Sequence, residues 1–406
     1  MKIAVVADDL TSATDGGIAF AKAGHPTMVA LDLSNLATAN QWDVLSIDTD
    51  SRIRPQEEAV QRVYDAVFRL RDRDLLYKTV DSTIRGHLAG ELRAALQASG
   101  RRAAIFAPAF PEAGRITRGG HQLLNGIGIS ATPFASDPLH PVRTDNITSI
   151  LSAGGESVAV LDRHSAGRRD VLEMALRVHS TLVVDAETPS DLRAMVHAVP
   201  EPRDVVWIGS PGLARALAQA FRGGASPPKR SRSRRVMIAI GSTNPVSRNQ
   251  LAHLSPLVDQ TVTIDSESAS VAPEDAAREA VASLDPNGRM ETVVVTSTLS
   301  GSWISREWAP RVAESIAVAV RILHESAPYD GFILTGGDTA VKVARTLGTT
   351  GIVLESELSA GIPIGAFEGP TRARVITKAG GFGDSATLIA ALKHLIGERT
   401  TKESVA

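Results

Sequence analysis

Residues 77–92 read YKTVDSTIRGHLAGEL and mark a change from one kind of secondary structure to another. Residues 75–80 are predicted to form a strand, and a helical repeat of Leu88 and Leu92 begins beyond it. The charged residues Lys78, Asp81 and Arg85 gather where the strand ends. Because charged side chains enter an apolar core only at a high cost, this grouping indicates a ligand site.

The alternation of short β-branched runs with helical patterns continues along the whole chain, which is typical of parallel sheets flanked by helices. We therefore predict an α/β protein of two domains, each with a largely parallel sheet, and a ligand cleft between them. The expected strands are 3–7, 44–47, 75–80, 103–107, 158–161, 182–184 and 205–208, then 236–240, 262–264, 292–296, 331–335, 352–354 and 373–377.

The boundary between the domains is predicted at SPPKRSRSRR, residues 226–235, which has two prolines, repeated serines and five basic residues. A nucleic-acid-binding or targeting segment is the alternative, but a strand follows at once, so an exposed linker is favoured. The predicted domains are therefore residues 1–225 and 236–406.

Composition narrows the function classes. The net charge of −2 over 406 residues and the 4% aromatic content disfavour a nucleic-acid partner. The absence of cysteine excludes disulfides, thiolate zinc sites and a cysteine nucleophile, and favours the cytoplasm. No apolar run approaches the roughly 20 residues of a membrane helix, so we expect no membrane partner.

Ligands of open α/β sheets bind beyond the carboxyl ends of strands, so we consider the residues that follow each strand. Both signs of charge meet there: a cation suits an anionic small molecule, and a carboxylate suits hydroxyls or proton transfer. Helix capping is the alternative for Asp8 and Asp9, because a helix is expected to begin near Thr11. The residues concerned are Asp8, Asp9, Asp48, Asp50, Arg52, Lys78, Asp81, Ser82 and Arg85.

The second half has glycine turns between strand and helix, at residues 241–242, 336–339 and 380–383. A helix N-terminus behind such a turn can hold phosphate, although a capped tight turn is the alternative. Gly381-x-Gly383-x-x-Ala386 is similar to a dinucleotide fingerprint, but no strand with an acidic ribose ligand is expected after it. No P-loop and no zinc motif occurs. The turns together predict a nucleotide site.

These residues resemble the four-carbon acid sugar kinase family, the ATP-dependent threonate and 3-oxo-tetronate kinases. The resemblance spans nearly the whole chain and rests on ADDLTSATD at 7–15, DSR at 50–52, KTVDSTIRG at 78–86, AFPEAGR at 109–115, GGDT at 336–339 and TKAGGFG at 377–383. The sequence departs from the family pattern at Ser12, where glycine is usual, and at Pro370. Ser12 could narrow the substrate pocket.

The resemblance implies an N-terminal acid-sugar-binding domain and a C-terminal nucleotide-binding domain that uses ATP and Mg²⁺. It implies phosphorylation of the terminal hydroxyl of a four-carbon sugar acid such as D-threonate, in a protein for which a homodimer is an open expectation. It assigns no metal ligand. The residues expected to meet the sugar acid are Asp8, Asp9, Arg52, Lys78, Asp81, Ser82, Thr83, Ile84 and Arg85. Those expected to meet ATP are Ser242, Gly336, Gly337, Asp338, Thr339, Gly380, Gly381 and Gly383.

The proton of the substrate hydroxyl needs an acceptor, and both Asp81 and Asp9 are candidates. Two other functions stay open: an NAD-dependent oxidoreductase of sugar acids, which the misplaced fingerprint disfavours, and a non-catalytic sugar-acid-binding protein, which would not need the glycine turns.

Overall fold

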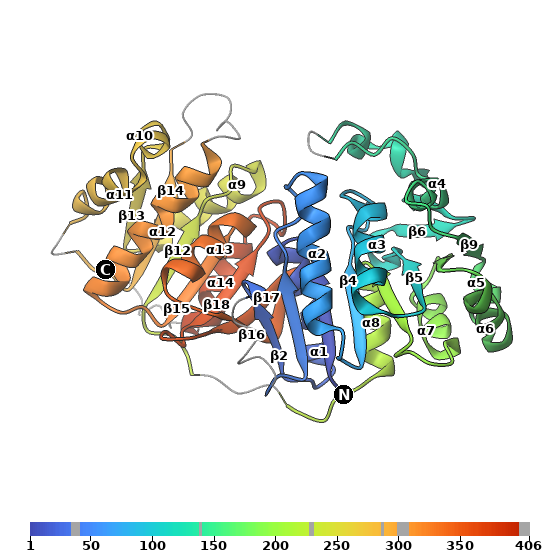
Figure 1. Cartoon of the computed structure of the whole chain (residues 1–406). Helices are drawn as coiled ribbons and strands as arrows, with labels where there is room; N and C mark the ends of the chain where they lie inside the picture. Colours follow the sequence, from blue (N-terminus) through green and yellow to red (C-terminus); the bar gives the residue numbers. More distant parts are fainter. Residues whose placement is uncertain (34–40, 138–139, 227–230, 286–287, 299–307, 398–406) are drawn as a thin grey trace. The chain divides into compact units, whose positions relative to one another are not determined.

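The computed structural model describes residues 1–33, 41–137, 140–226, 231–285, 288–298 and 308–397. The chain divides into two compact units, Met1–Pro227 and Pro228–Ala406. Of the predicted linker, residues 227–230 lie outside the described residues. Each unit is an α/β unit whose strands are mostly parallel and flanked by helices (Figure 1), which confirms the expected fold class.

The first unit is built on a parallel sheet in the order β2-β3-β1-β4-β11-β5-β10-β9. Its strands are β1 Ile3–Ala7, β2 Thr27–Ala30, β3 Val44–Asp48, β4 Leu75–Thr79, β5 Ala103–Ala107, β9 Val158–Leu161, β10 Thr181–Val184 and β11 Val205–Gly209. Its helices are α1 Leu10–Lys22, α2 Gln56–Leu70, α3 Leu88–Ser99, α4 Ile147–Ser152, α5 Arg163–Ala166, α6 Arg169–Val178, α7 Pro189–Ala198 and α8 Pro211–Ala220.

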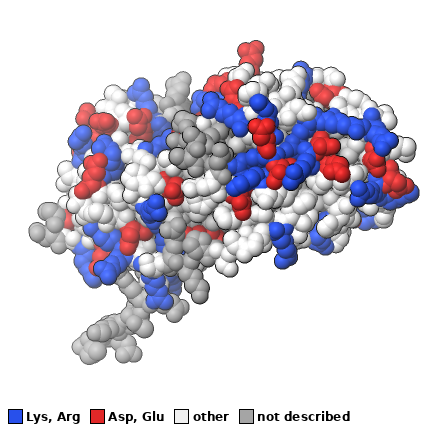
Figure 2. All heavy atoms as spheres, turned by 60° about the horizontal axis from the view of Figure 1, so that its bottom comes forward, with Lys and Arg blue, Asp and Glu red and all other residues white. Residues whose placement is uncertain are grey.

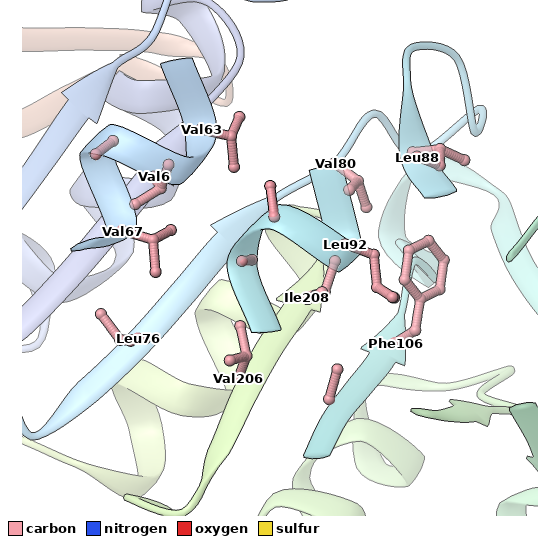
Figure 3. Close-up of a cluster of buried hydrophobic side chains, with 14 of the residues drawn as sticks. Val6, Val63, Val67, Leu76, Val80, Leu88, Leu92, Phe106, Val206 and Ile208 are labelled. Atoms are coloured by element: carbon pink, nitrogen blue, oxygen red, sulfur yellow. The ribbon is translucent and has the colours of Figure 1, made fainter. Parts of the chain in front are cut away.

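Both faces of this sheet are covered, which explains why its strands are continuous apolar runs rather than alternating ones. Successive residues of β1 point to opposite faces, so Val6 joins one buried cluster and Val5 the other. The first cluster is covered by α2 and α3, whose Val67 and Leu92 pack toward the strands (Figure 3). The second is covered by α1, α7 and α8.

The segment of residues 108–128, which follows β5, forms structure of its own. It contains the short helical turn Pro111–Ala113 and a small antiparallel sheet of β6 Arg115–Arg118, β7 His121–Leu124 and β8 Ile127–Gly128. The buried Gln122 donates from Nε2 to the Ser82 carbonyl oxygen at 2.7 Å. This small sheet is therefore anchored to the turn that follows β4.

The second unit has the strand order β13-β14-β12-β15-β18-β17-β16, in which the first five are parallel and β17 is antiparallel to both neighbours. Its strands are β12 Val236–Ile240, β13 Gln260–Ile264, β14 Thr292–Ser297, β15 Gly331–Thr335, β16 Gly351–Ser359, β17 Ile362–Glu368 and β18 Arg374–Lys378. Its helices are α9 Pro245–Leu254, α10 Ser266–Val271, α11 Pro273–Ala282, α12 Ala309–Ser326, α13 Gly337–Thr346 and α14 Thr387–Ile396.

Five strands were not predicted from the sequence: β6, β7 and β8 of the small sheet, and β2 and β17. β2 is only four residues long, and β17 contains Pro363 and Gly365, which are typical strand breakers. Gly365 is accommodated because β17 passes close to its neighbour: an added Cβ would lie 2.2 Å from the Val353 carbonyl oxygen. Gly365 is therefore needed for the close approach of β17 to its neighbour, and it does not end the strand.

The charges of the surface are mixed. Lys and Arg side chains lie beside Asp and Glu side chains over the face drawn in Figure 2. The ion pairs of the described residues include Lys2–Asp43 at 3.3 Å and Arg203–Asp74 at 3.1 Å. Among the described residues, no helix combines the length and the apolar character needed to cross a membrane. The cytoplasmic location and the absence of a nucleic-acid partner stay predictions.

Candidate functional site

The carboxyl ends of three neighbouring parallel strands bring the predicted first-half residues to one edge. In the register of the sheet, Ala7 of β1 lies beside Asp48 of β3, and Val6 lies beside Lys78 of β4. The turns that leave these strands carry Asp8 and Asp9, Arg52, and residues 81–85. The prediction that these segments converge follows from parallel pairing alone.

Arg52 is the centre of the first group. Its Nε and Nη2 donate to the two Asp8 carboxylate oxygens at 2.8 and 2.9 Å, Nη2 also donates to Ser12 Oγ at 2.9 Å, and Nη1 pairs with Asp9. Its side chain is still 21% exposed, whereas that of Asp8 is only 5% exposed. The guanidinium therefore has room to meet a ligand from the solvent side.

The two neighbouring carboxylates differ in electrostatic character. Burial acts to raise the pKa of Asp8, but Arg52 and Lys78 outweigh it and lower this pKa to about 2. Burial raises the pKa of Asp9, and the nearby Asp8 charge adds to the rise against the effect of Arg52. Asp9 also caps α1, since its Oδ1 accepts from the Ser12 amide at 2.6 Å. Asp9 therefore caps α1, as the capping alternative predicted, and also forms an ion pair with Arg52.

The turn after β4 forms the second group. Arg85 Nε donates to Asp81 Oδ2 at 2.6 Å, and Arg85 Nη1 donates to Asp137 Oδ2 at 3.0 Å. Burial would raise the pKa of Asp81, but hydrogen bonds and charge from Arg85 lower it. Ile84 adopts a φ of +55°, a left-handed conformation that is costly for a β-branched residue. Thr83 and Ile84 have buried side chains, so mainly their backbone can meet a ligand.

The Lys78 side chain is buried, although the sequence analysis expected it to contact the ligand. Its side chain is 2% exposed, and Nζ lies 2.9 Å from Glu91 Oε2 and donates to the Thr79 carbonyl oxygen at 2.6 Å. Ser51 donates to the other Glu91 oxygen at 2.8 Å. The structure thus gives Lys78 an internal ion pair, from which its charge still lowers the pKa of Asp8.

In the second unit the three glycine turns lie against one another. An added Cβ at Gly380 would lie 2.1 Å from Ser242 Oγ, and one at Gly241 would lie 2.0 Å from Thr339 Oγ1. These separations are short, so a side chain at either glycine would force the facing Ser242 or Thr339 side chain to move. Segments that are 98 and 138 residues apart along the chain therefore meet beyond the ends of β12, β15 and β18.

The turn GGDT leads directly into a helix. Gly336 has a φ of +100°, and α13 starts at Gly337 with Asp338 in its first turn and Thr339 buried. The N-terminus of α9 begins at Pro245, three residues beyond Ser242. Two helix N-termini and a glycine loop are the elements from which proteins build phosphate sites.

Comparisons with known proteins match the two units to two different domain families. Residues 3–217 match a family described as a sugar-binding N-terminal domain, and residues 237–388 match one described as a nucleotide-binding C-terminal domain. The chain is 32% identical to a D-threonate kinase of Salmonella typhimurium, over 97% of this chain and 98% of that protein. The chain belongs to the four-carbon acid sugar kinase family.

Further members of the four-carbon acid sugar kinase family give the same picture. A 3-oxo-tetronate kinase of Methylobacterium radiotolerans is 26% identical, over 94% of this chain and 96% of that protein. A crystal structure from Bordetella bronchiseptica, described as a domain-swapped dimer with bound citrate, is 28% identical. It covers 99% of this chain and 100% of its own, with a TM-score of 0.50.

Two residues of the charged cluster at the carboxyl edge of β1, β3 and β4 were not predicted from the sequence, Glu91 and Asp137. Glu91 sits on the buried face of α3 among Leu88 and Leu92, a position that signals either core packing or a buried partner. Asp137 comes from a segment 52 residues beyond Arg85 and carries no local signal. Among the described residues, no group of three or more His, Asp or Glu side chains is arranged to hold a metal ion.

Proposed function

We propose that this protein is an ATP-dependent kinase that phosphorylates the terminal hydroxyl of a four-carbon sugar acid, D-threonate or a 3-oxo-tetronate. The names of its relatives support the reaction class. The observation that carries the proposal is the mixture of charges at the carboxyl edge of β1, β3 and β4. Two partly exposed guanidinium groups, Arg52 and Arg85, lie there among carboxylates.

The sugar acid needs both kinds of group. Arg85 is 27% exposed and spends Nε and Nη1 on Asp81 and Asp137, which leaves part of its donor fork for a substrate carboxylate. Asp8 and Asp9 offer acceptors to substrate hydroxyls, with Arg52 holding both in place. Lys78 contributes through its charge behind Asp8 rather than by contact. Citrate in the Bordetella relative supports a pocket for a hydroxylated carboxylic acid.

Asp9 is the base we favour over Asp81. A general base works best when its pKa lies near the operating pH. Burial raises the pKa of Asp9, whereas Arg85 and Thr83 lower that of Asp81 by occupying its Oδ2 atom. Asp81 then serves to orient Arg85. Phosphoryl transfer depends chiefly on alignment and charge neutralisation, so the base contributes only part of the rate.

The second unit supplies the nucleotide site of the proposal. The packed turns around Ser242, Gly336 and Gly380 fit a polyphosphate, because their glycines carry no side chain of their own that would keep phosphate oxygens from the backbone amides. Mg²⁺ bound with ATP would neutralise phosphate charge, and one or two carboxylates suffice to hold it beside the phosphates. Asp338, in the first turn of α13, is the carboxylate we assign to ATP or Mg²⁺ binding.

The decisive test is a coupled ADP-release assay with D-threonate, D-erythronate and 3-oxo-tetronates. We expect turnover with at least one of them and thermal protection by Mg-ATP but not by NAD, because a ligand of the folded state raises its stability. NAD-dependent oxidation would support the oxidoreductase. Sugar-acid binding without ATP protection or turnover would support the binding protein.

The base is tested separately with Asp9→Asn and Asp81→Asn at saturating Mg-ATP. Loss of kcat by a factor of about 10² to 10⁴ in Asp9→Asn, with a smaller loss in Asp81→Asn, is the expected result. The reverse order would assign the base to Asp81. The mass of the protein in solution tests the homodimer, which stays a prediction.

A further inference from the structure

Lys378 ends β18 and has a buried amino group. Only 4% of the residue is exposed. Its Nζ donates to three carbonyl oxygens of the loop that follows it: Ala379 at 2.9 Å, Gly380 at 3.2 Å and Phe382 at 3.2 Å. Ser247 of α9 lies 3.3 Å from the same nitrogen and itself donates to the Gly380 carbonyl oxygen at 2.6 Å. The loop is thus wrapped around one ammonium.

The direction of these carbonyls decides the direction of the amides. In a planar trans peptide, the C=O of one residue and the N–H of the next point in opposite directions. Because the carbonyls of Ala379, Gly380 and Phe382 point inward at Lys378, the N–H groups of Gly380, Gly381 and Gly383 point away from it. Among the hydrogen bonds of the described residues, none uses these three amides as donors.

The charge of Lys378 is not compensated nearby. Within the described part of the chain, no carboxylate oxygen lies within salt-bridge distance of its Nζ. Burial lowers the pKa of Lys378 to about 8, and no ion pair opposes that effect. A buried cation without a protein anion beside it favours an anion on the open side of the loop.

We propose that Lys378 is a positioning residue for the polyphosphate of the nucleotide: it holds the loop carbonyls inward so that the amides of Gly380, Gly381 and Gly383 face the phosphate oxygens. The inference rests on the proposed function, since it takes the anion to be ATP. Lys378 does not touch the phosphates. Lys378 orders the glycine loop, and its positive charge lies on the side of the loop opposite the phosphates.

The test compares two variants. Lys378→Met removes both the hydrogen bonds and the charge, whereas Lys378→Gln removes the charge and keeps a polar amide group. The matched control is Lys342→Met on α13, where the lysine is 34% exposed and lies 3.7 Å from Glu314. Calorimetry measures the Kd of Mg-ATP, of inorganic tripolyphosphate and of D-threonate for the full chain. Tripolyphosphate isolates the phosphate contacts from those of the base and ribose.

We expect Lys378→Met to weaken ATP and tripolyphosphate by about 10- to 100-fold, as for loss of hydrogen bonds that involve a charged group. Lys378→Gln should fall between it and the wild type, and D-threonate binding should not change. Unchanged tripolyphosphate binding in either variant would overturn the inference and leave the kinase proposal standing. Wild-type protein that binds neither ATP nor tripolyphosphate would overturn both. Equal loss of D-threonate affinity would reduce Lys378 to a general structural residue.

Discussion

Replacing Arg52 with methionine tests the ion pairs that hold the charged side chains together at the carboxyl edge of β1, β3 and β4. Arg52 makes a two-point contact with Asp8 and a further ion pair with Asp9. Its loss leaves the 5% exposed Asp8 carboxylate without its main partner. Removing one partner of a buried pair costs about 3 to 5 kcal/mol, far more than the 0 to 1 kcal/mol of an exposed pair.

The pKa of Asp8 gives an independent magnitude. Arg52 and Lys78 overcome burial and lower it from 3.8 to about 2. At about 1.4 kcal/mol for each tenfold change in proton affinity, this contributes about 2 kcal/mol to the free energy of unfolding at neutral pH. Because the folded-state pKa is depressed, the contribution is complete above pH 3.8 and is lost as the pH falls toward 2.

Urea unfolding of the full chain at pH 7 measures the effect. Arg52→Met should lower the free energy of unfolding by about 3 kcal/mol or more, and the added change Asp8→Asn should recover a large part of it by removing the unpaired charge. The control is Arg54→Met, since Arg54 is 36% exposed and its pairs with Asp50 and Glu58 lie at the surface. We expect less than about 1 kcal/mol there. An Arg52→Met variant no less stable than the control, or a double variant no better than the single one, would refute the reasoning.

The remaining predictions concern the substrate, the nucleotide and the pH. Arg85→Ala should raise the KM for the sugar acid by about 10- to 100-fold and leave the KM for ATP unchanged in steady-state assays; equal effects on both would point to a structural role. Asp338→Ala should weaken Mg-ATP binding in calorimetry and spare D-threonate, and the opposite pattern would reject its assignment to the nucleotide. Burial, with the charges of Asp9, Asp50 and Asp8, raises the pKa of Asp48 to about 8, so the folded state keeps a proton that the unfolded chain loses near pH 3.8. Stability should therefore fall as the pH rises from about 4 to 8, and melting curves of Asp48→Asn should show a weaker decline than those of the wild type; identical pH profiles would contradict the raised pKa.

Local sequence patterns determined most of the strands of this protein. The strands 3–7, 103–107, 158–161, 236–240 and 331–335 were predicted with the bounds that the structure has. Strands buried on both faces of a parallel sheet are apolar throughout, so a short run of adjacent apolar residues is enough to predict them. The convergence of Asp9, Arg52 and Asp81 also follows from sequence, because parallel strands end at a common edge.

The tertiary structure decided which partner each side chain meets. Lys78 and Arg85 are both cations of one motif, yet Lys78 points inward to Glu91 and Arg85 reaches Asp137. The packed contact of Ser242 with Gly380 joins turns that are distant in sequence. Such pairings depend on where α3, the loops and the sheet place each carboxylate and carbonyl oxygen in space. They follow from the packing of whole elements, because no local pattern of propensity or periodicity encodes a partner dozens of residues away.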